Sequence, residues 1–163
     1  MSHPHTPLFG NNANLNGENL DKSDLRNKVM QGASLDGASL RGASLSRIDL
    51  SAYVSSTGEK RSADLDGADL RGADLDGANL IGAWLRGADL RGTYMDANTN
   101  LDGAQLQGAD LRGAEGLEYA NITRDTNLDG ADLRGTGLNK HALEQKTHHL
   151  SGTMMPEGIP YQR

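Results

Sequence analysis

The chain of 163 residues contains no cysteine, and its aromatic residues amount to only 4%. The lack of cysteine excludes a secreted scaffold held by disulfides, a thiolate metal site, an iron–sulfur cluster and a cysteine nucleophile. Runs of ~18 consecutive apolar residues, which a transmembrane helix needs, are also missing, and the N-terminus lacks the basic and apolar regions of a signal peptide. We therefore expect a soluble, cytoplasmic protein with no membrane association.

An excess of positive charge is missing too. The chain has 16 basic and 22 acidic residues, a net charge of −6, and no run of Lys or Arg. Direct binding to nucleic acid relies on clustered Lys and Arg, so we do not expect it. Leu, Ile, Val and Phe together make up only about 18% of the chain, a share near which composition begins to suggest disorder. Composition alone therefore indicates a weak core.

The apolar residues that are present recur with a period of five. From Leu15 to Leu143 the series has 26 places, of which 24 carry Leu, Met or Ile and two, Ser55 and Lys60, are defective. A small residue, usually Ala, stands two residues before each central residue, and 15 of the 21 glycines stand two residues after one. The unit is Ala-Asp/Asn/Ser-Leu-X-Gly, and its frame slips by one residue around 96–100, 114–116 and 123–126.

A period of five fits neither an α-helix nor a flat strand. It fits a short extended stretch, with Ala and Leu on one side and Asp on the other, followed by a tight turn whose third residue, Gly, has a positive φ. Four such sides would close a square coil with Leu and Ala inside. The predicted core residues are Leu35, Leu40, Leu45, Leu65, Leu70, Leu75, Leu80, Leu85, Leu90, Leu106, Leu111 and Leu133.

The run from Ala63 to Gly72, Ala-Asp-Leu-Asp-Gly-Ala-Asp-Leu-Arg-Gly, resembles the consensus of the pentapeptide-repeat proteins. The resemblance covers roughly residues 13 to 143, and the Leu-rich core resembles the cyanobacterial type. It implies an all-β fold, a right-handed quadrilateral β-helix, here with about 6 to 7 coils and short helical or irregular caps. The expected parts are an N-terminal cap at 1–12, the repeat at 13–143 with an interrupting loop at 51–62, and a C-terminal cap or tail at 144–163.

Both ends of such a rod need caps, because open ends expose unpaired strand edges. Pro7, Leu8 and Phe9 precede the first repeat, and Glu18 and Lys28 at inward positions predict a first turn that is irregular or open to solvent. Residues 138–146 indicate a short helix or a distorted coil. We expect a lid over the core, or else a dimerisation surface, made by Leu143, Leu150, Met154 and Met155.

The longest interruption is the segment 51–62. It preserves the period, since Leu50 and Leu65 are fifteen residues apart, but Lys60 would be a buried cation if the coil continued undisturbed. We therefore expect a loop that leaves the rod. It is either a tolerated insertion or a partner-binding loop, since recognition often lies on loops.

Counting in twenties, with the slips included, assigns outward residues to faces. One face combines Asp69, Asp89, Asp110 and Asp132 with Arg71, Arg91, Arg112 and Arg134, which either neutralise one another or form a docking surface. The next face carries an acidic column of Asp36, Asp76, Asp96 and Glu118. The face after it carries Asn79, Asn100 and Asn121.

Several outward residues are candidate partner contacts. They comprise three aromatic residues, which are rare in this chain, and four charged ones: Tyr53, Trp84, Tyr94, Asp76, Asp96, Arg91 and Arg112. Single exposed residues of this kind are also common without any contact role.

No arrangement indicates catalysis or a cofactor. The five histidines lie near the termini, and a cluster of His141, His148 and His149 lacks a fourth ligand. Glycines that recur every five residues do not form a phosphate-binding loop, and no Ser/His/Asp set is evident. We expect no catalytic residue, no metal and no cofactor.

The sequence therefore predicts a non-catalytic structural or protein–protein interaction module, a rigid scaffold that is a monomer or an end-to-end dimer and has an unknown protein partner. The resemblance supplies an alternative, because family members linked to quinolone resistance mimic DNA and bind DNA gyrase. The net charge of −6 agrees with that alternative, whereas the interspersed Arg and the Leu-rich core favour the structural or interaction module.

Overall fold

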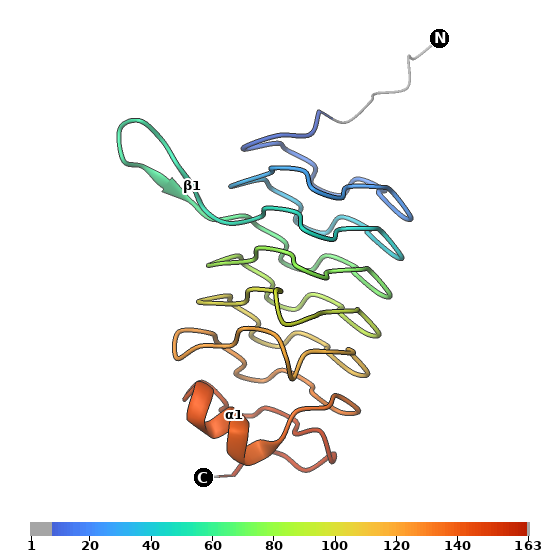
Figure 1. Ribbon diagram of the computed structural model, residues 1–163, viewed down its shortest axis with the longest axis vertical. Helices are drawn as coiled ribbons and strands as arrows, with labels where there is room; N and C mark the ends of the chain where they lie inside the picture. The colour runs from blue at the N-terminus through green and yellow to red at the C-terminus, as the bar shows by residue number, and fades with distance from the viewer. Residues whose placement is uncertain (1–7, 163) are drawn as a thin grey trace.

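The computed structural model describes residues 8–162. The chain winds into a rod of stacked coils with a short helix near its C-terminal end (Figure 1). Its regular elements are β1 (Tyr53–Val54) and β2 (Lys60–Arg61), which form an antiparallel hairpin, and α1 (Lys140–Lys146). Within this part of the chain, no helix is long and apolar enough to cross a membrane.

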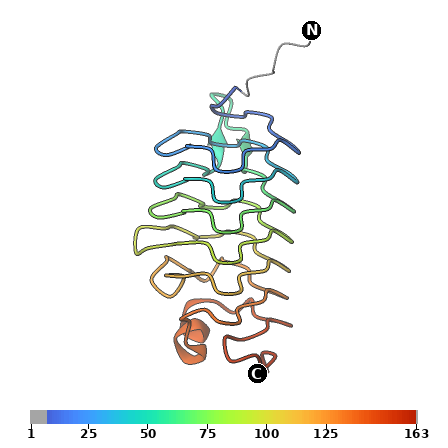
Figure 2. The ribbon, with the colours of Figure 1, turned by 90° about the vertical axis from the view of Figure 1, so that its right-hand side faces the viewer.

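Isolated parallel bridges hold successive coils together and form four columns, which we call faces 1 to 4 in chain order (Figure 2). Face 1 contains Asn14, Ser34, Asp64, Trp84, Gln105 and Asn127. Face 2 contains Asn19, Ser39, Asp69, Asp89, Asp110, Asp132 and Met154. Face 3 contains Asp24, Ser44, Asp74, Tyr94 and Glu115, and face 4 contains Val29, Asp49, Asn79, Asn100 and Asn121.

Each side repeats the same backbone hydrogen bonds. The Leu35 N–H donates to the Asp64 carbonyl at 2.6 Å, and the Asp64 N–H donates to the Ala33 carbonyl at 2.9 Å. At the corner, the Ala38 N–H donates to the Leu35 carbonyl at 2.9 Å, and Gly37, the third residue of this turn, has a φ of 63°. The observed turn is the one that the repeat predicts, with glycine where the backbone is left-handed.

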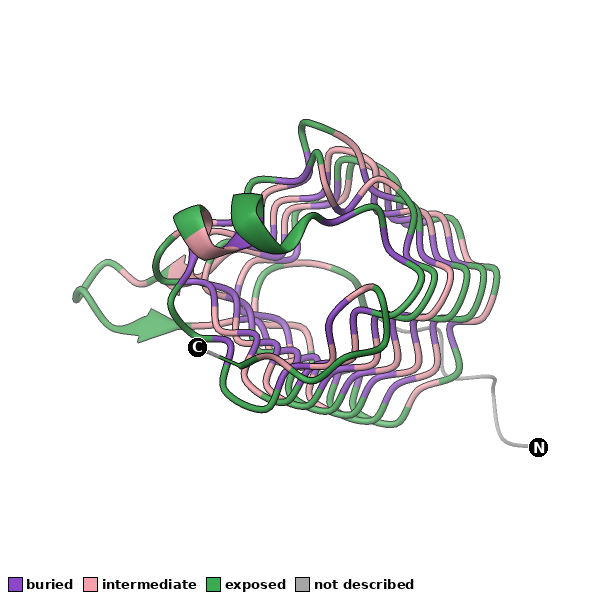
Figure 3. Cartoon of the chain, turned by 90° about the horizontal axis from the view of Figure 1, so that it is seen from below, coloured by how far each residue is buried: buried purple, intermediate pink, exposed green. Residues whose placement is uncertain are grey.

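The core is a column of Leu and Ala side chains inside the coils. All twelve predicted core leucines are buried, each at most 1% exposed. Seen along the rod, buried positions follow one another in register from coil to coil (Figure 3). Few large apolar residues suffice because the period of five turns nearly all of them inward.

The N-terminal coil is regular although it carries charges at inward positions. Glu18 and Lys28 are half-buried at the open end of the rod, and the Lys28 ammonium lies 5.2 Å from the centre of the Phe9 ring. Of the two expected outcomes, an irregular turn or an open one, the structure shows the open one. Pro7 lies outside the described residues.

The C-terminal end is covered by α1 and the segment after it. The Asn139 side chain caps α1 by accepting the Ala142 N–H at 3.2 Å. Leu143, Leu150 and Met155 are buried at the end of the core. The prediction that Met154 also covers the core is wrong, because Met154 bridges Asp132 on face 2 and points outward.

The segment 51–62 leaves the rod as the hairpin β1–β2. Ser34 bridges Asp64, thirty residues later, whereas Asn14 bridges Ser34 after twenty. Ten residues therefore project from the rod, and two of the expected coil sides, those centred on Ser55 and Lys60, do not exist.

This excursion corrects one face assignment. Ten residues equal two sides, so counting in twenties across the hairpin is wrong by half a coil. The Gly37 N–H donates to the Asp66 carbonyl at 2.9 Å, which places Asp36 beside Asp66 at the corner after face 1. The prediction that Asp36 belongs to a column with Asp76 and Asp96 is therefore wrong. Beyond the hairpin, the slips lengthen the bridge spacing from twenty to 21 or 22 residues without breaking the columns.

Candidate protein-interaction surfaces

A ladder of alternating carboxylates and guanidinium groups runs along face 2. We call it the Asp–Arg ladder, and it consists of Asp21, Asp69, Asp89, Asp110, Asp132, Arg41, Arg71, Arg91, Arg112 and Arg134. The Arg71 side chain donates to both Asp69 oxygens, at 2.9 and 2.6 Å, and its Nε lies 3.6 Å from Asp89 in the next coil. A spacing of two residues creates the first contact, and stacking of the coils creates the second.

The ladder is electrostatically satisfied. Hydrogen bonds from the partner Arg side chains lower the pKa of Asp69, Asp110 and Asp132. Hydrogen bonds to Asp89 likewise raise the pKa of Arg91. Arg91 and Arg112, two candidate contacts, are both members of this ladder and are already engaged by carboxylates. A partner that docks on face 2 must either bind to intact ion pairs or replace them with new ones.

A smaller acidic site lies at the corner after face 3. A hollow of about 420 Å³ there has a lining with three carboxylates and one guanidinium group, from Asp74, Asp76, Asp96 and Arg47. Burial, and then the charges of Asp74 and Asp96, raise the pKa of Asp76. Asp96 is tied into the backbone: burial raises its pKa, but N–H groups of Gly77 and Asn98, at 2.8 and 2.9 Å, outweigh this and lower it. The candidate contacts Asp76 and Asp96 thus lie together, and hydrogen bonds from backbone N–H groups hold Asp96 in place.

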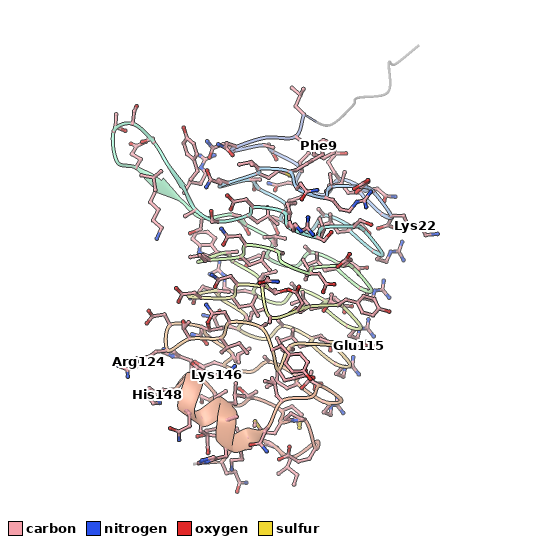
Figure 4. The ribbon with its side chains drawn as sticks, viewed as in Figure 1. Phe9, Lys22, Glu115, Arg124, Lys146 and His148 are labelled. Carbon is pink, nitrogen blue, oxygen red and sulfur yellow. The ribbon has the colours of Figure 1, made fainter. Side chains whose placement is uncertain are left out.

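The remaining acidic and histidine candidates do not gather into a site. Glu118 packs against Gly137, where a Cβ would lie 2.5 Å from the Glu118 carboxyl carbon. His141, His148 and His149 are exposed, and His148 lies beside α1 at the surface (Figure 4). Among residues 8–162 there is no group of three His, Asp or Glu side chains that could hold a metal ion.

The exposed aromatic candidates lie on different faces. Trp84 is 40% exposed on face 1, and Tyr94 is 47% exposed on face 3, two sides away. The Arg86 guanidinium lies 5.0 Å from the Trp84 ring, in cation–π geometry. Tyr119, which is 67% exposed, was not predicted as a contact; it stands two residues after Leu117, in the slot that usually holds glycine. Trp84 and Tyr94 therefore cannot form one aromatic patch.

The hairpin creates a groove against face 1. The groove has a volume of about 600 Å³, and we call it the hairpin groove; its lining residues are Asn12, Asn14, Gly32, Ser34, Lys60, Arg61, Ser62, Asp64 and Trp84. A second hollow of about 590 Å³ lies along the hairpin itself and includes Tyr53, the last aromatic candidate. The base of the hairpin packs closely, since a Cβ on Gly32 would lie 2.8 Å from the Tyr53 Cβ.

Lys60 and Arg61 are the lining residues that sequence reasoning missed. In the sequence, Lys60 is a defective place in the repeat and indicates only that the segment leaves the rod. The available signal was the pair of consecutive cations within the longest departure from the period. Both side chains are exposed and form no ion pair with any residue that the structure describes.

Comparisons with known proteins point to one family. A sequence model of pentapeptide repeats matches eight copies in residues 13–51, 61–92 and 97–115, and so leaves out most of the hairpin. A comparison with curated proteins finds no match. Among solved structures, the chain is similar to HetL, a pentapeptide repeat protein involved in heterocyst differentiation regulation in the cyanobacterium Nostoc sp. strain PCC 7120.

The match to HetL has 35% identity and a TM-score of 0.56, and it covers 92% of this chain and 62% of HetL. The chain therefore spans less than two thirds of the length of HetL. Rfr23, from the cyanobacterium Cyanothece 51142, is 29% identical with a TM-score of 0.46, over 79% of this chain and 91% of Rfr23. QnrB1, a plasmid-mediated fluoroquinolone resistance protein, is 20% identical with a TM-score of 0.30, over 83% of this chain and 70% of QnrB1.

Proposed function

The chain belongs to the pentapeptide-repeat family, and from this premise we propose that it is a non-catalytic protein–protein interaction module. It is a right-handed rod of about six to seven coils that presents the hairpin β1–β2 to a partner protein. Members of the family fold as right-handed quadrilateral β-helices and generally act as scaffold or interaction proteins. The similarity to HetL, at 35% identity, supports a role in regulation.

One observation carries the proposal: the hairpin brings two adjacent exposed cations, Lys60 and Arg61, to a groove that Trp84 also lines. On face 2, the charges of the Asp–Arg ladder satisfy one another. On the hairpin, Lys60 and Arg61 are exposed without an ion pair among the described residues, next to the half-exposed Trp84. Binding at the hairpin therefore costs no existing ion pair.

Deletion of the hairpin tests the proposal cleanly. Removal of residues 53–62 together with Ala52→Gly joins Leu50 to Leu65 through Ser-Gly-Ala-Asp, a regular repeat unit. We expect this variant to keep the stability of the rod and to lose the partners that the whole protein captures from cells of its host. Capture of the same proteins by both forms would contradict a role of the hairpin. Failure of the whole protein to capture any protein would contradict the interaction function.

The alternative, a DNA mimic that binds gyrase, needs a surface with a run of unneutralised negative charge. Face 2, the most regular charged face, instead pairs five carboxylates with five guanidinium groups. A supercoiling assay with purified gyrase separates the two functions. We expect no change in supercoiling at micromolar protein, and inhibition would favour the DNA mimic.

A further inference from the structure

We propose that the hairpin groove binds an extended, acidic segment of a partner protein, with an apolar or aromatic side chain of that segment against Trp84. This inference rests on the proposed interaction function and names the surface and the chemistry of the partner. Four properties of the groove support it: its position at a strand edge, its charge, its aromatic wall and its length.

The groove lies at the free edge of the hairpin. Its lining includes Lys60 and Arg61 of β2 but neither residue of β1. The Ser55 N–H donates to the Glu59 carbonyl at 2.8 Å, and pairs in an antiparallel ladder alternate between hydrogen-bonded and non-hydrogen-bonded. The pair Val54–Lys60 is therefore non-hydrogen-bonded. The backbone N–H and C=O of Lys60 consequently point to the free edge, where an extended segment can pair with them.

The charge of the groove selects an acidic occupant. Lys60 and Arg61 contribute two positive charges, and Asp64 is the one carboxylate in the lining. An Asp64 oxygen already accepts the Asp66 N–H at 3.0 Å. On a chain with a net charge of −6 this is a local excess of positive charge. Two cations are too few for nucleic acid, because each neutralised phosphate adds only a modest share of binding and effective binders make about 6–10 such contacts.

Trp84 provides a fixed aromatic wall. Trp84 is 40% exposed, and the Arg86 guanidinium lies 5.0 Å from the centre of its ring. Arg86 is held in turn by Asp66, whose carboxylate accepts the Arg86 Nε–H at 2.8 Å. A large rigid side chain beside cations is the composition typical of interface hot spots, which are enriched in Trp and Arg.

The length of the groove fits a short peptide. Its wall on face 1 runs from Asn14 through Ser34 and Asp64 to Trp84, which is three coil steps. At ~4.8 Å per step this is ~14 Å, the span of about four extended residues. A linear segment therefore covers the cations and the tryptophan together.

The experiment is selection from a displayed library of random peptides of about twelve residues against the whole protein. We expect enrichment of peptides that combine Asp or Glu with an aromatic or large apolar residue, and their binding to weaken as salt rises to about 0.5 M, where exposed charges are screened. No enrichment, or enrichment of basic peptides, would overturn the proposal. Equally, binding of single-stranded DNA at the groove, or self-association that depends on Lys60, would assign it another occupant.

Variants locate the binding site. Lys60→Glu with Arg61→Glu, and separately Trp84→Ala, are expected to weaken the selected peptides by about tenfold or more, as hot-spot substitutions do. The matched control, Lys22→Glu with Arg124→Glu, changes the net charge equally at two exposed cations on opposite sides of the rod (Figure 4). Equal weakening by the control would reduce the effect to net charge alone.

A backbone substitution tests pairing at the strand edge. Lys60→Pro removes the N–H that points into the groove, and Lys60→Ala removes the charge only. Val54→Pro places the same ring at the opposite edge of the hairpin and serves as the control. We expect Lys60→Pro to bind more weakly than Lys60→Ala, and Val54→Pro to bind normally. Equal binding by the proline and alanine variants at Lys60 would refute pairing at this edge.

The outcomes also separate this inference from the interaction function on which it rests. Cellular partners that are captured by the whole protein and also by the Lys60→Glu, Arg61→Glu variant would refute the groove and leave the interaction module intact. Loss of peptide selection together with failure to capture any cellular protein would refute both.

Discussion

Thr99 closes a place where the repeat gains one residue, and its removal gives a sharp test of the fold. The Thr99 hydroxyl is buried, accepts the Asp96 N–H at 3.0 Å and lies 2.9 Å from the Leu75 carbonyl, to which it donates. Thr126 makes the same pair of bonds at the last slip, to the Thr123 N–H and the Leu101 carbonyl. A hydroxyl at this inward position thus forms hydrogen bonds with backbone N–H and C=O groups where the repeat contains an extra residue.

The substitution Thr99→Val keeps the shape and removes both bonds. The Leu75 carbonyl retains the Ala78 N–H at 2.9 Å, but the Asp96 N–H loses its partner. An unsatisfied buried N–H costs about 1–3 kcal/mol, and the lost hydroxyl bond about 0.5–1.5 kcal/mol. The added methyl returns about 0.8 kcal/mol. The free energy of unfolding is therefore expected to fall by about 1–4 kcal/mol.

Thr93→Val is the matched control. Thr93 is equally buried but lies in a regular unit, where its hydroxyl only donates to the Leu90 carbonyl at 2.9 Å. The lost bond and the gained methyl nearly cancel, so we expect a change within about 1 kcal/mol. Urea unfolding of both variants measures the difference, which at a slope of ~2 kcal/mol per molar urea is about 1 M in midpoint for Thr99→Val. Equal midpoints for the two variants would refute the role of the hydroxyl at the slip.

Three further predictions concern corners and charges. Gly116→Ala places a Cβ onto the Met95 carbonyl group and is expected to lower the free energy of unfolding by more than about 3 kcal/mol. Gly67→Ala, with a φ of +64° and open space around its Cβ, is expected to lower it by only about 0–1.5 kcal/mol. Equal losses of the two variants in urea unfolding would contradict this. Asp76→Asn is expected to raise the urea midpoint at pH 7, because the fold raises the pKa of this carboxyl and so disfavours its charge, and the gain vanishes in acid, where Asp76 is protonated. Carboxyls of the Asp–Arg ladder have a lowered pKa in the fold, so their contribution to the free energy of unfolding is present above pH ~4, the unfolded value, and is lost as the pH falls through the folded value. Arg112→Gln is expected to make the free energy of unfolding less dependent on pH in acid. An unchanged dependence on pH would show that the ladder contributes nothing.

The core and most faces could be predicted because the repeat leaves little freedom. Once Ala and Leu face inward and Gly supplies the left-handed corner, the outward position of every following residue is fixed by its slot. Asp69, Asp89, Asp110 and Asp132 accordingly bridge one another as counting predicts, and so do Asn79, Asn100 and Asn121. One-residue slips do not disturb this, since each is absorbed at a corner.

The position of Asp36 could not be predicted by counting, for a physical reason. Ten residues that continue around the coil and ten that project as a hairpin leave the same period of five between Leu50 and Leu65. Only the cost of burying Lys60 distinguishes the two paths, and it does not say how many sides are lost. The outward position of Met154, by contrast, follows from the sequence, because Leu150 and Met155 are five residues apart and continue the period.

The hairpin groove was beyond the sequence for a different reason. The exposure of each wall can be predicted separately, since Trp84 stands in an outward slot and Lys60 cannot stand in an inward one. Their proximity depends on the direction in which the hairpin leaves the rod, and that is set by contacts distant in sequence. Gly32, which lies 21 residues before Tyr53, leaves the space that the Tyr53 side chain occupies at the base of the hairpin.

The distribution of satisfied and free charges indicates where specificity resides in a rod of this kind. Ladder residues on face 2 stabilise one another, so a ligand there gains only the difference between new and existing ion pairs, and exposed pairs are worth ~0–1 kcal/mol to begin with. Lys60 and Arg61 are solvated and have no ion pair among the described residues that a ligand must break. The adjacent Trp84 adds apolar surface that the Asp usual at this slot would not provide. The ladder thus makes face 2 a weak competitor for partners, and the segment that breaks the repeat offers two adjacent cations beside an aromatic ring.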